Sequence, residues 1–340
     1  MTKKRDFMMS MTRRQLGLVA LAACSTGALA SCGGDSKKQS GSSASDAGGT
    51  RTVTDARGKV EVPASPKRIG ATDNRIFRSL EAWGIDLVVA PRKLMPKDIS
   101  YKNDESILDS GSHREPNLEQ FVAADPDLVL NGQRYAQHYD DIKALVPNAA
   151  LVDTDIDTET KPIDEELKRQ MTLLGETLGH EAEAKDLIAS FEKAIERVKA
   201  AYNSEDKVMG LITSGGTINY AAPKTGRAVG PLFPVLGLTP ALQVEGTGDH
   251  KGDDVSLEAI ASANPDWIIV MDRDAAVAAD EEGYKPAAEL IDNAEALSHV
   301  TAITEGNVVY MPSNFYITED IQAYTEFLET FAKALEAKKG

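Results

Sequence analysis

Cysteine is almost absent from this chain of 340 residues. Its two cysteines, Cys24 and Cys32, both lie within the first 32 residues. The rest of the chain can therefore form no disulfide and no thiolate metal site. Its stability must come from a buried core, and the roughly 290 residues that follow position 50 are enough for two domains of ordinary size.

The common signatures of enzymes are also missing. The sequence contains no Gly-x-Ser-x-Gly nucleophile motif, no His-Glu-x-x-His zinc motif and no phosphate-binding P-loop. Ser190 and Lys193 have the Ser-x-x-Lys spacing of penicillin-interacting enzymes, but the companion motifs are absent. The five histidines are scattered singly, which disfavours direct capture of zinc or manganese. We predict a binding protein that is not an enzyme and has no intrinsic cofactor.

Positive charge is in short supply. The chain has 37 Lys and Arg against 53 Asp and Glu, a formal net charge of −16. Residues 1–31 hold five of the basic and one of the acidic residues, so the chain without them has 32 basic and 52 acidic residues and a net charge of −20. Such a chain is a poor partner for nucleic acid.

The apolar run at residues 16–30 is too short for a stable membrane span. It follows a basic start and has the length of a secretory signal peptide. It ends in Leu29-Ala30-Ser31-Cys32, which resembles the lipobox at which bacterial lipoproteins are cut and diacylated. We predict a signal peptide at residues 1–31 and lipidation of Cys32. A rival lipobox at residues 21–24 leaves Cys24 as an alternative.

Two further predictions concern export and anchoring. Residues 12–16 resemble a twin-arginine export signal, and both the twin-arginine and the general secretory route stay open. Residues 32–50 are almost all Gly, Ser, Ala, Asp, Lys and Gln, a composition that cannot bury a core. We expect this segment to be a flexible tether from the lipidated cysteine, which would hold the protein outside the cytoplasm on a membrane.

The remaining chain alternates apolar strands with amphipathic helices, which indicates largely parallel sheets. A hairpin is expected at residues 52–63, and βα units follow up to residue 152. Residues 163–202 are nearly free of helix breakers and predict two helices, at 163–178 and 181–201. The βα alternation then resumes. We predict an α/β fold with two Rossmann-like lobes, at residues 51–180 and 205–340, joined by one long backbone helix at 181–204.

A degenerate internal repeat supports the two-lobed fold. Residues 116–134 recur in register at 255–273, each copy reading as a short helix, a Pro-Asp break, a buried run and an arginine. The six matched pairs are Leu118/Leu257, Glu119/Glu258, Ala124/Ala263, Pro126/Pro265, Asp127/Asp266 and Arg134/Arg273. Arg134 and Arg273 would follow strand ends, where α/β sheets bind ligands. We therefore expect one arginine from each lobe to clamp an anion.

In the order and spacing of its motifs, the chain resembles the helical-backbone substrate-binding lipoproteins of bacterial ABC importers for ferric siderophores, haem and vitamin B12. The resemblance spans roughly residues 51–337. It rests on the opening stretch at 53–69, the two Leu-Glu…Pro-Asp segments and the long helix between them. Within that family the sequence is most similar to binders of catecholate siderophores, through residues 95–97, 115–119, 226–227, 271–273 and 315–316.

The resemblance implies a binding site. Arg134, Arg227 and Arg273 would surround the anionic iron–catecholate centre, and Tyr220 is a further candidate for the cleft. A guanidinium is always charged and can serve two oxygens at once. His250 and Tyr316 would coordinate ferric iron directly when the siderophore leaves two positions free, as imidazole and phenolate can.

The resemblance also implies partners. Glu119 and Glu258 would dock on the two subunits of a two-fold ABC permease with its ATPase, and the binding protein would be a monomer. Iron would be carried as the ferric siderophore. The same fold could instead carry haem, cobalamin or another iron chelate. Haem is the foremost alternative because Tyr316 or His250 could be its axial ligand.

Overall fold

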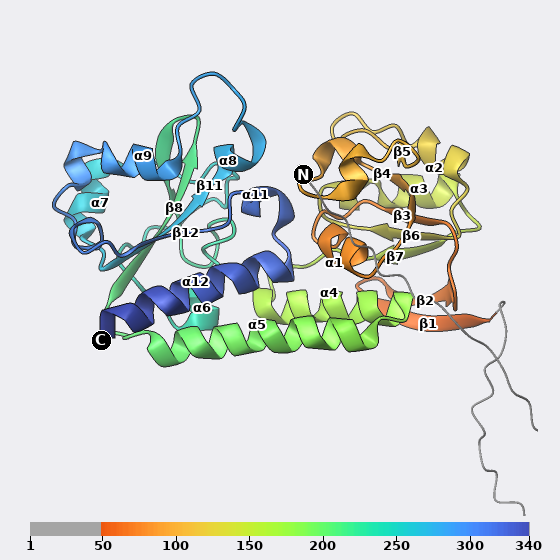
Figure 1. Ribbon diagram of the computed structural model, residues 1–340, viewed down its shortest axis with the longest axis horizontal. Coiled ribbons are helices and arrows are strands. Elements are labelled where there is room, and N and C mark those ends of the chain that lie inside the picture. Colours follow the sequence, from red (N-terminus) through yellow and green to blue (C-terminus); the bar gives the residue numbers. More distant parts are fainter. Residues whose placement is uncertain (1–48, 340) are drawn as a thin grey trace, which may run out of the picture. The chain divides into compact units, whose positions relative to one another are not determined.

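The computed structural model describes residues 49–339. The predicted signal peptide, both cysteines, the twin-arginine motif and nearly all of the tether lie outside the described residues. The chain from residue 49 onward builds two five-stranded sheets, one in each of two lobes, above a layer of long helices (Figure 1). The predicted α/β fold with two lobes is confirmed.

The N-terminal lobe contains a parallel sheet in the order β5-β4-β3-β6-β7. Its elements are the hairpin β1 (Thr50–Asp55) and β2 (Gly58–Pro63), the sheet strands β3 (Ile69–Ala71), β4 (Leu87–Ala90), β5 (Leu108–Asp109), β6 (Leu128–Asn131) and β7 (Ala150–Asp153), the helices α1 (Phe77–Ala82), α2 (Glu119–Ala124) and α3 (Tyr139–Leu145), and the 3-10 helices η1 (Arg92–Leu94), η2 (Ser100–Asn103) and η3 (Gln133–His138).

The C-terminal lobe has the sheet order β10-β8-β11-β12, with β9 antiparallel to β8. Its elements are β8 (Lys207–Ser214), β9 (Thr217–Ala221), β10 (Thr239–Pro240), β11 (Trp267–Asp272), β12 (Val308–Tyr310), α6 (Leu232–Leu236), α7 (Leu257–Ala263), α8 (Arg273–Val277), α9 (Ala287–Asp292), η4 (Glu295–Leu297), α10 (Thr301–Thr304) and α11 (Phe315–Thr318). After β12, residues 315–318 form the one-turn helix α11.

The two copies of the repeat occupy equivalent places in the two lobes. Helices α2 and α7 each end in a left-handed residue, Asp125 with φ 45° and Asn264 with φ 42°, types that tolerate this conformation. The next aspartates then accept a backbone N–H at the start of the neighbouring strand segment: Asp127 from Lys67 at 2.7 Å, and Asp266 from Lys207 at 2.7 Å. The aspartate of each Pro-Asp pair thus helps to align β6 with β3 and β11 with β8.

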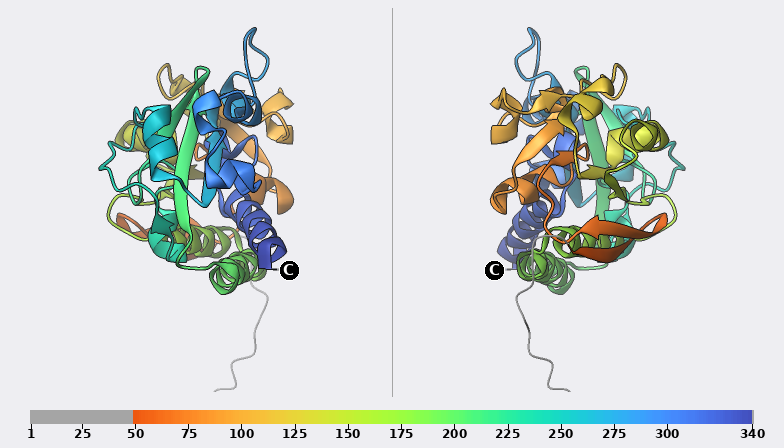
Figure 2. Two further views of the ribbon diagram at one scale, coloured as in Figure 1. Left: turned by 90° about the vertical axis from the view of Figure 1, so that its left-hand side faces the viewer. Right: turned by 90° about the vertical axis from the view of Figure 1, so that its right-hand side faces the viewer.

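The link between the lobes is stronger than one helix. Helix α4 (Ile163–Leu178) leads through Gly179, at φ +77°, into the long helix α5 (Glu181–Ala201), as predicted. The last helix, α12 (Ile321–Lys339), lies along α5, and Arg197 of α5 pairs with Glu336 at 2.6 Å (Figures 1 and 2).

The first turn of α12 reaches the N-terminal lobe. Asp320 accepts a hydrogen bond from the Ala323 backbone at 2.6 Å and lies 3.3 Å from Arg78 of α1. Gln322 donates to Ser79 of α1 at 3.0 Å. Contacts of α12 with α5 and with α1 therefore connect the two lobes.

Asp320 predicts a pH dependence of stability. Its complete burial raises its pKa to about 6, despite the neighbouring Arg78. A carboxyl whose pKa in the fold exceeds its unfolded value of about 4 stabilises the fold fully below pH ~4 and loses that contribution as the pH rises through ~6. Relative to Asp320→Asn, the unfolding free energy of the wild type should fall by about 1–3 kcal/mol between pH 4 and pH 7.

Urea unfolding of both proteins at the two pH values measures this difference. Burial also raises the pKa of Asp73 to about 6. Asp73 is present in both proteins, so its contribution to the pH dependence cancels in the difference. A difference that does not change with pH would show that Asp320 does not titrate in this range.

Candidate ligand-binding site

Three guanidinium groups surround one aromatic ring between the lobes. The Cζ atoms of Arg134, Arg227 and Arg273 lie 5.7, 4.4 and 4.9 Å from the ring centroid of Tyr316. These distances are in the range of cation–π contacts. Four residues that the sequence singled out are thus brought together by the fold.

The strands explain this convergence. Arg134 lies in η3, just after β6, and Arg273 is the first residue of α8, directly after β11. Both positions are at the carboxyl ends of parallel strands, where α/β sheets bind ligands. Arg227 comes from the loop after β9, and Tyr316 from α11. Arg134 alone among the four belongs to the N-terminal lobe.

Arg134 contacts the C-terminal lobe directly. Its Nη2 donates to the Tyr316 carbonyl at 3.2 Å and its Nη1 donates to the Gln133 amide oxygen at 3.0 Å. Burial lowers the pKa of Arg134, and no carboxylate lies within ion-pair distance of it among residues 49–339. A half-buried guanidinium without an acidic partner has a strong preference for an anion.

Arg273 is balanced locally. Its Nη1 lies 3.1 Å from Asp274, and it donates to the Ser214 hydroxyl at 3.4 Å. Its Nε is buried and has no hydrogen-bond partner among the described residues.

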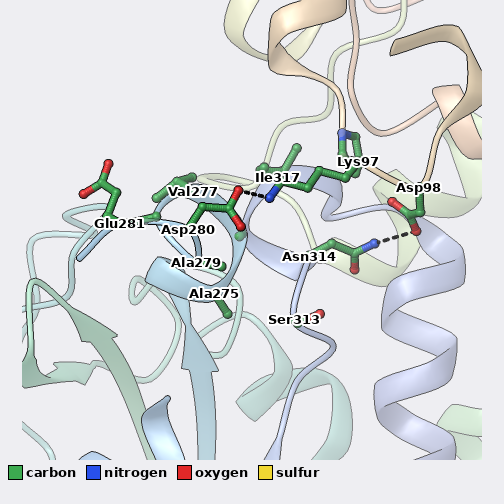
Figure 3. Close-up of a pocket in the computed structure, with 13 residues that line it drawn as sticks. Lys97, Asp98, Ala275, Val277, Ala279, Asp280, Glu281, Ser313, Asn314 and Ile317 are labelled. Carbon is green, nitrogen blue, oxygen red and sulfur yellow. Dashed lines mark hydrogen bonds and ion pairs between the residues drawn. The ribbon is translucent and has the colours of Figure 1, made fainter. Parts of the chain in front are cut away.

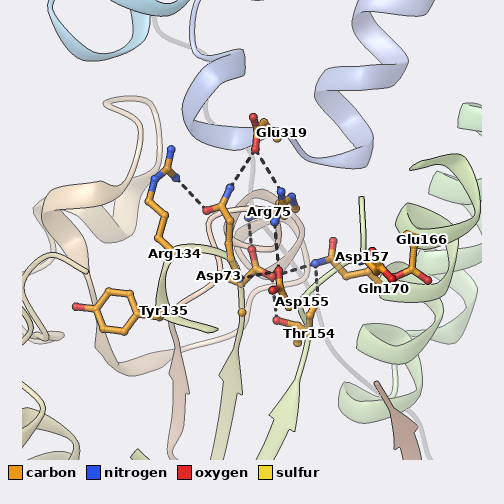
Figure 4. Close-up of polar contacts among 12 residues, drawn as sticks. Asp73, Arg75, Arg134, Tyr135, Thr154, Asp155, Asp157, Glu166, Gln170 and Glu319 are labelled. Atoms are coloured by element: carbon orange, nitrogen blue, oxygen red, sulfur yellow. Dashed lines mark hydrogen bonds and ion pairs between the residues drawn. The ribbon is translucent and has the colours of Figure 1, made fainter. Parts of the chain in front are cut away.

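Sequence reasoning missed Glu319, which is central to the site. Its side chain is only 7% exposed. One carboxylate oxygen accepts from Arg227 Nε at 2.6 Å. The other accepts from Arg75 Nη2 at 3.3 Å (Figure 4). Burial alone would raise the pKa of Glu319, but Arg227 and Arg75 lower it below its ordinary value. The group is therefore an ionised carboxylate among guanidiniums.

Arg75 connects Glu319 to the N-terminal lobe. It also lies 3.5 Å from Asp155, and its backbone N–H donates to Asp73 at 2.8 Å. Asp73 accepts in turn from Thr154 and Gln170, each at 3.0 Å, which anchors this network to β7 and α4 (Figure 4). No local motif marks Arg75 or Glu319, because their partners lie up to 244 residues away in the sequence.

Two cavities flank this cluster, and the segment around α11 contributes to both. One of about 550 Å³ has Pro96, Asp98, Ala276 and Ile317 in its wall, and Lys97 pairs with Asp280 across it (Figure 3). The other, of about 590 Å³, is lined by residues of both lobes that include Arg75, Arg227 and Glu319. The second cavity therefore opens directly onto the charged groups.

The remaining predicted residues lie elsewhere. His250 is in the loop before α7. Burial lowers its pKa, and the positive charges of Arg273 and Arg227 lower it further. Tyr220 is 3% exposed, packs in the C-terminal core and donates to the Leu242 carbonyl at 2.6 Å, so the fold does not bring it to the arginines. Glu119 and Glu258 are exposed on the equivalent helices α2 and α7.

The arrangement can bind an anion, but among residues 49–339 it includes no cluster of protein side chains that would bind a metal ion by itself. Guanidinium forks, a phenol and a nearby imidazole offer hydrogen bonds and two potential iron ligands. No group of three or more His, Cys, Asp or Glu suited to a metal ion occurs within residues 49–339. In the same part of the chain, no helix is both long and apolar enough to cross a membrane.

Comparisons with known proteins agree with this architecture. The petrobactin-binding protein YclQ of Bacillus subtilis is 26% identical over 323 residues, which cover 94% of this chain and 95% of the relative. The ferric-anguibactin-binding protein FatB of Vibrio anguillarum is 27% identical, over 77% of this chain and 80% of its own. Both are named as binding proteins, in agreement with the prediction that the chain is not an enzyme.

A solved structure extends the likeness to three dimensions. A TroA-like periplasmic binding protein from Xylanimonas cellulosilytica has a TM-score of 0.68 and 27% identity, and covers 81% of this chain and 91% of its own. The family model described as periplasmic binding protein matches residues 69–315, which include both sheets and the helices between them. On this match, the protein is a member of the periplasmic binding protein family.

Proposed function

We propose that the protein captures a ferric siderophore, of the catecholate type, outside the cytoplasm and delivers it to an ABC importer. The observation that carries this proposal is the set of three guanidiniums around Tyr316, drawn from both lobes. Catecholate oxygens are anionic and come in adjacent pairs, which matches the fork of an arginine. The names of the relatives support iron chelates as the ligand class.

Binding should depend on both lobes. A unit charge about 4 Å from a guanidinium gains roughly 4 kcal/mol at an effective dielectric near 20, before the cost of desolvation. Acidic groups on the distant surface are screened beyond about 8 Å at physiological salt. The local arginines therefore outweigh the net negative charge of the chain.

Calorimetric titration of the purified protein with a ferric catecholate should give saturable binding, and Arg134→Ala and Arg273→Ala should each weaken it at least about tenfold. Lys193→Ala, which removes a positive charge from the exposed face of α5 outside the cleft, is the control and should leave the affinity unchanged. Ferric hydroxamate, haemin and cobalamin are titrated in parallel. Tight binding of haemin that survives both cleft substitutions would move the function to haem uptake.

We further propose that Tyr316 and His250 complete the coordination of iron when the siderophore supplies only two catecholates. The Tyr316 ring lies among the guanidiniums of Arg134, Arg227 and Arg273. Phenolate is a hard anionic donor suited to ferric iron, and imidazole is a borderline donor.

Optical spectra test this ligation. Tyr316→Phe keeps the ring that the arginines surround but removes the oxygen. The visible charge-transfer band of a bound ferric bis-catecholate should therefore differ between the wild type and Tyr316→Phe, and His250→Ala should change it independently. The band of a tris-catecholate, whose iron has no free position, should be the same in all three proteins. Identical bis-catecholate bands would exclude direct ligation.

Delivery requires a membrane and a transporter. We propose that lipidated Cys32 anchors the chain and that Glu119 and Glu258 dock on a two-fold permease. Both glutamates are exposed on matched helices of the repeat, and α2 also carries the exposed Val122. Glu258 borders a surface groove of about 840 Å³. A pseudo-symmetric protein with one acidic site on each lobe suits a two-fold partner.

Uptake of radiolabelled ferric catecholate by cells tests delivery. The double change Glu119→Ala and Glu258→Ala should lower uptake severalfold without changing ligand affinity, and Cys32→Ser should release the protein from the membrane. Glu196→Ala, at an exposed glutamate of α5, is the control and should not affect uptake. Normal uptake by the double variant would refute these docking sites.

A further inference from the structure

The carboxylate of Glu319 occupies the centre of the cationic site. It joins Arg227 of the C-terminal lobe to Arg75 of the N-terminal lobe, and the Gln133 amide lies 3.5 Å from it. It also lines the cavity that opens onto these groups. Any anion that enters this cavity therefore meets a fixed negative charge beside the arginines.

The charges of the cluster nearly cancel. Four guanidiniums belong to it, from Arg75, Arg134, Arg227 and Arg273. Three carboxylates lie within ion-pair distance of them, from Glu319, Asp155 and Asp274. At most one positive charge is left uncompensated, so the site as built matches a ligand with a small net negative charge.

Glu319 cannot easily withdraw or become neutral. The guanidiniums of Arg227 and Arg75 lower its pKa below the ordinary value of a glutamate, which favours the ionised form. Its backbone has a left-handed conformation, with φ 46°, between α11 and α12. The adjacent Asp320 is held by Arg78 and by the first turn of α12. The negative charge is thus a permanent part of the site.

We propose that Glu319 selects the ligand by its charge: it favours a ferric complex with one net negative charge over one with three. A ferric ion with two catecholate dianions carries one negative charge, and with three it carries three. Each additional ligand charge is repelled by Glu319 in a partly desolvated cavity. A repulsive element of this kind gives specificity against the wrong ligand. The inference rests on the proposed function and adds a selectivity to it.

The experiment compares two ferric complexes that share the same spacer, a linear bis-catecholate and a tris-catecholate. Their affinities for the purified full-length chain are measured by calorimetry, for the wild type and for Glu319→Gln. The substitution keeps the shape and removes the charge. The tris-catecholate should bind on the order of tenfold or more tightly to the variant, and the bis-catecholate should change much less. The preference of the wild type for the bis-catecholate should shrink or reverse.

Matched variants separate charge from shape. Glu196→Gln, at an exposed carboxylate of α5, makes the same change in net charge outside the cavity and should leave the preference unchanged. Glu319→Asp should retain the wild-type preference. Asp155→Asn removes a carboxylate from the other side of Arg75 and should shift the preference in the same direction as Glu319→Gln. It also tests the idea if Glu319→Gln does not fold.

Each outcome has a distinct meaning. If the wild type binds neither complex, the proposed function fails. If it binds them but Glu319→Gln and Asp155→Asn leave the ratio of affinities unchanged, only the charge selection is refuted. Equal weakening of both ligands by Glu319→Gln would likewise overturn it, because Glu319 would then serve only to position Arg227.

Discussion

The structure depends on how it gathers four guanidiniums at one junction between two lobes. Like charges repel, and burial removes the water that would otherwise screen them. Glu319 resolves this conflict by accepting hydrogen bonds from Arg227 and Arg75, one from each lobe. Asp155 compensates part of the charge of Arg75, and Asp274 compensates that of Arg273. Arg134 is left without a carboxylate among the described residues, and it is the group with most to gain from an anionic ligand.

Helices α5 and α12 hold this junction in place. Helix α12 begins at Ile321, two residues after Glu319, and runs along α5. Asp320 and Gln322 at its start contact α1. The segment that carries Tyr316 and Glu319 is therefore clamped at its C-terminal end by both lobes. A large hinge motion would break the Arg78 contact and the α5–α12 packing together. Small adjustments of side chains and loops are consequently the expected response to a ligand.

The fold was largely predictable because its signals are local and repeated. Strand and helix periodicity located most elements, and the recurrence of Pro-Asp reflects one hydrogen bond made twice, by Asp127 and Asp266. Arg134 and Arg273 could be paired because they close equivalent copies of the repeat. Glu319 could not be found in this way, since it is one of 53 acidic residues and its partners Arg75 and Arg227 are distant in sequence. Tyr220 shows a related limit, because side chains alternate along a strand and periodicity does not say which face meets the ligand.

A site of this kind balances two demands on the same charges. Without internal carboxylates, the clustered arginines would destabilise the unliganded protein. With too many, they would have nothing left to attract an anion. The small excess of positive charge around Tyr316 is a compromise between these limits. It implies that affinity comes from the geometry of the hydrogen bonds as much as from net attraction. An acidic protein can in this way bind an anion, because the balance is set within a few ångströms and not by the surface.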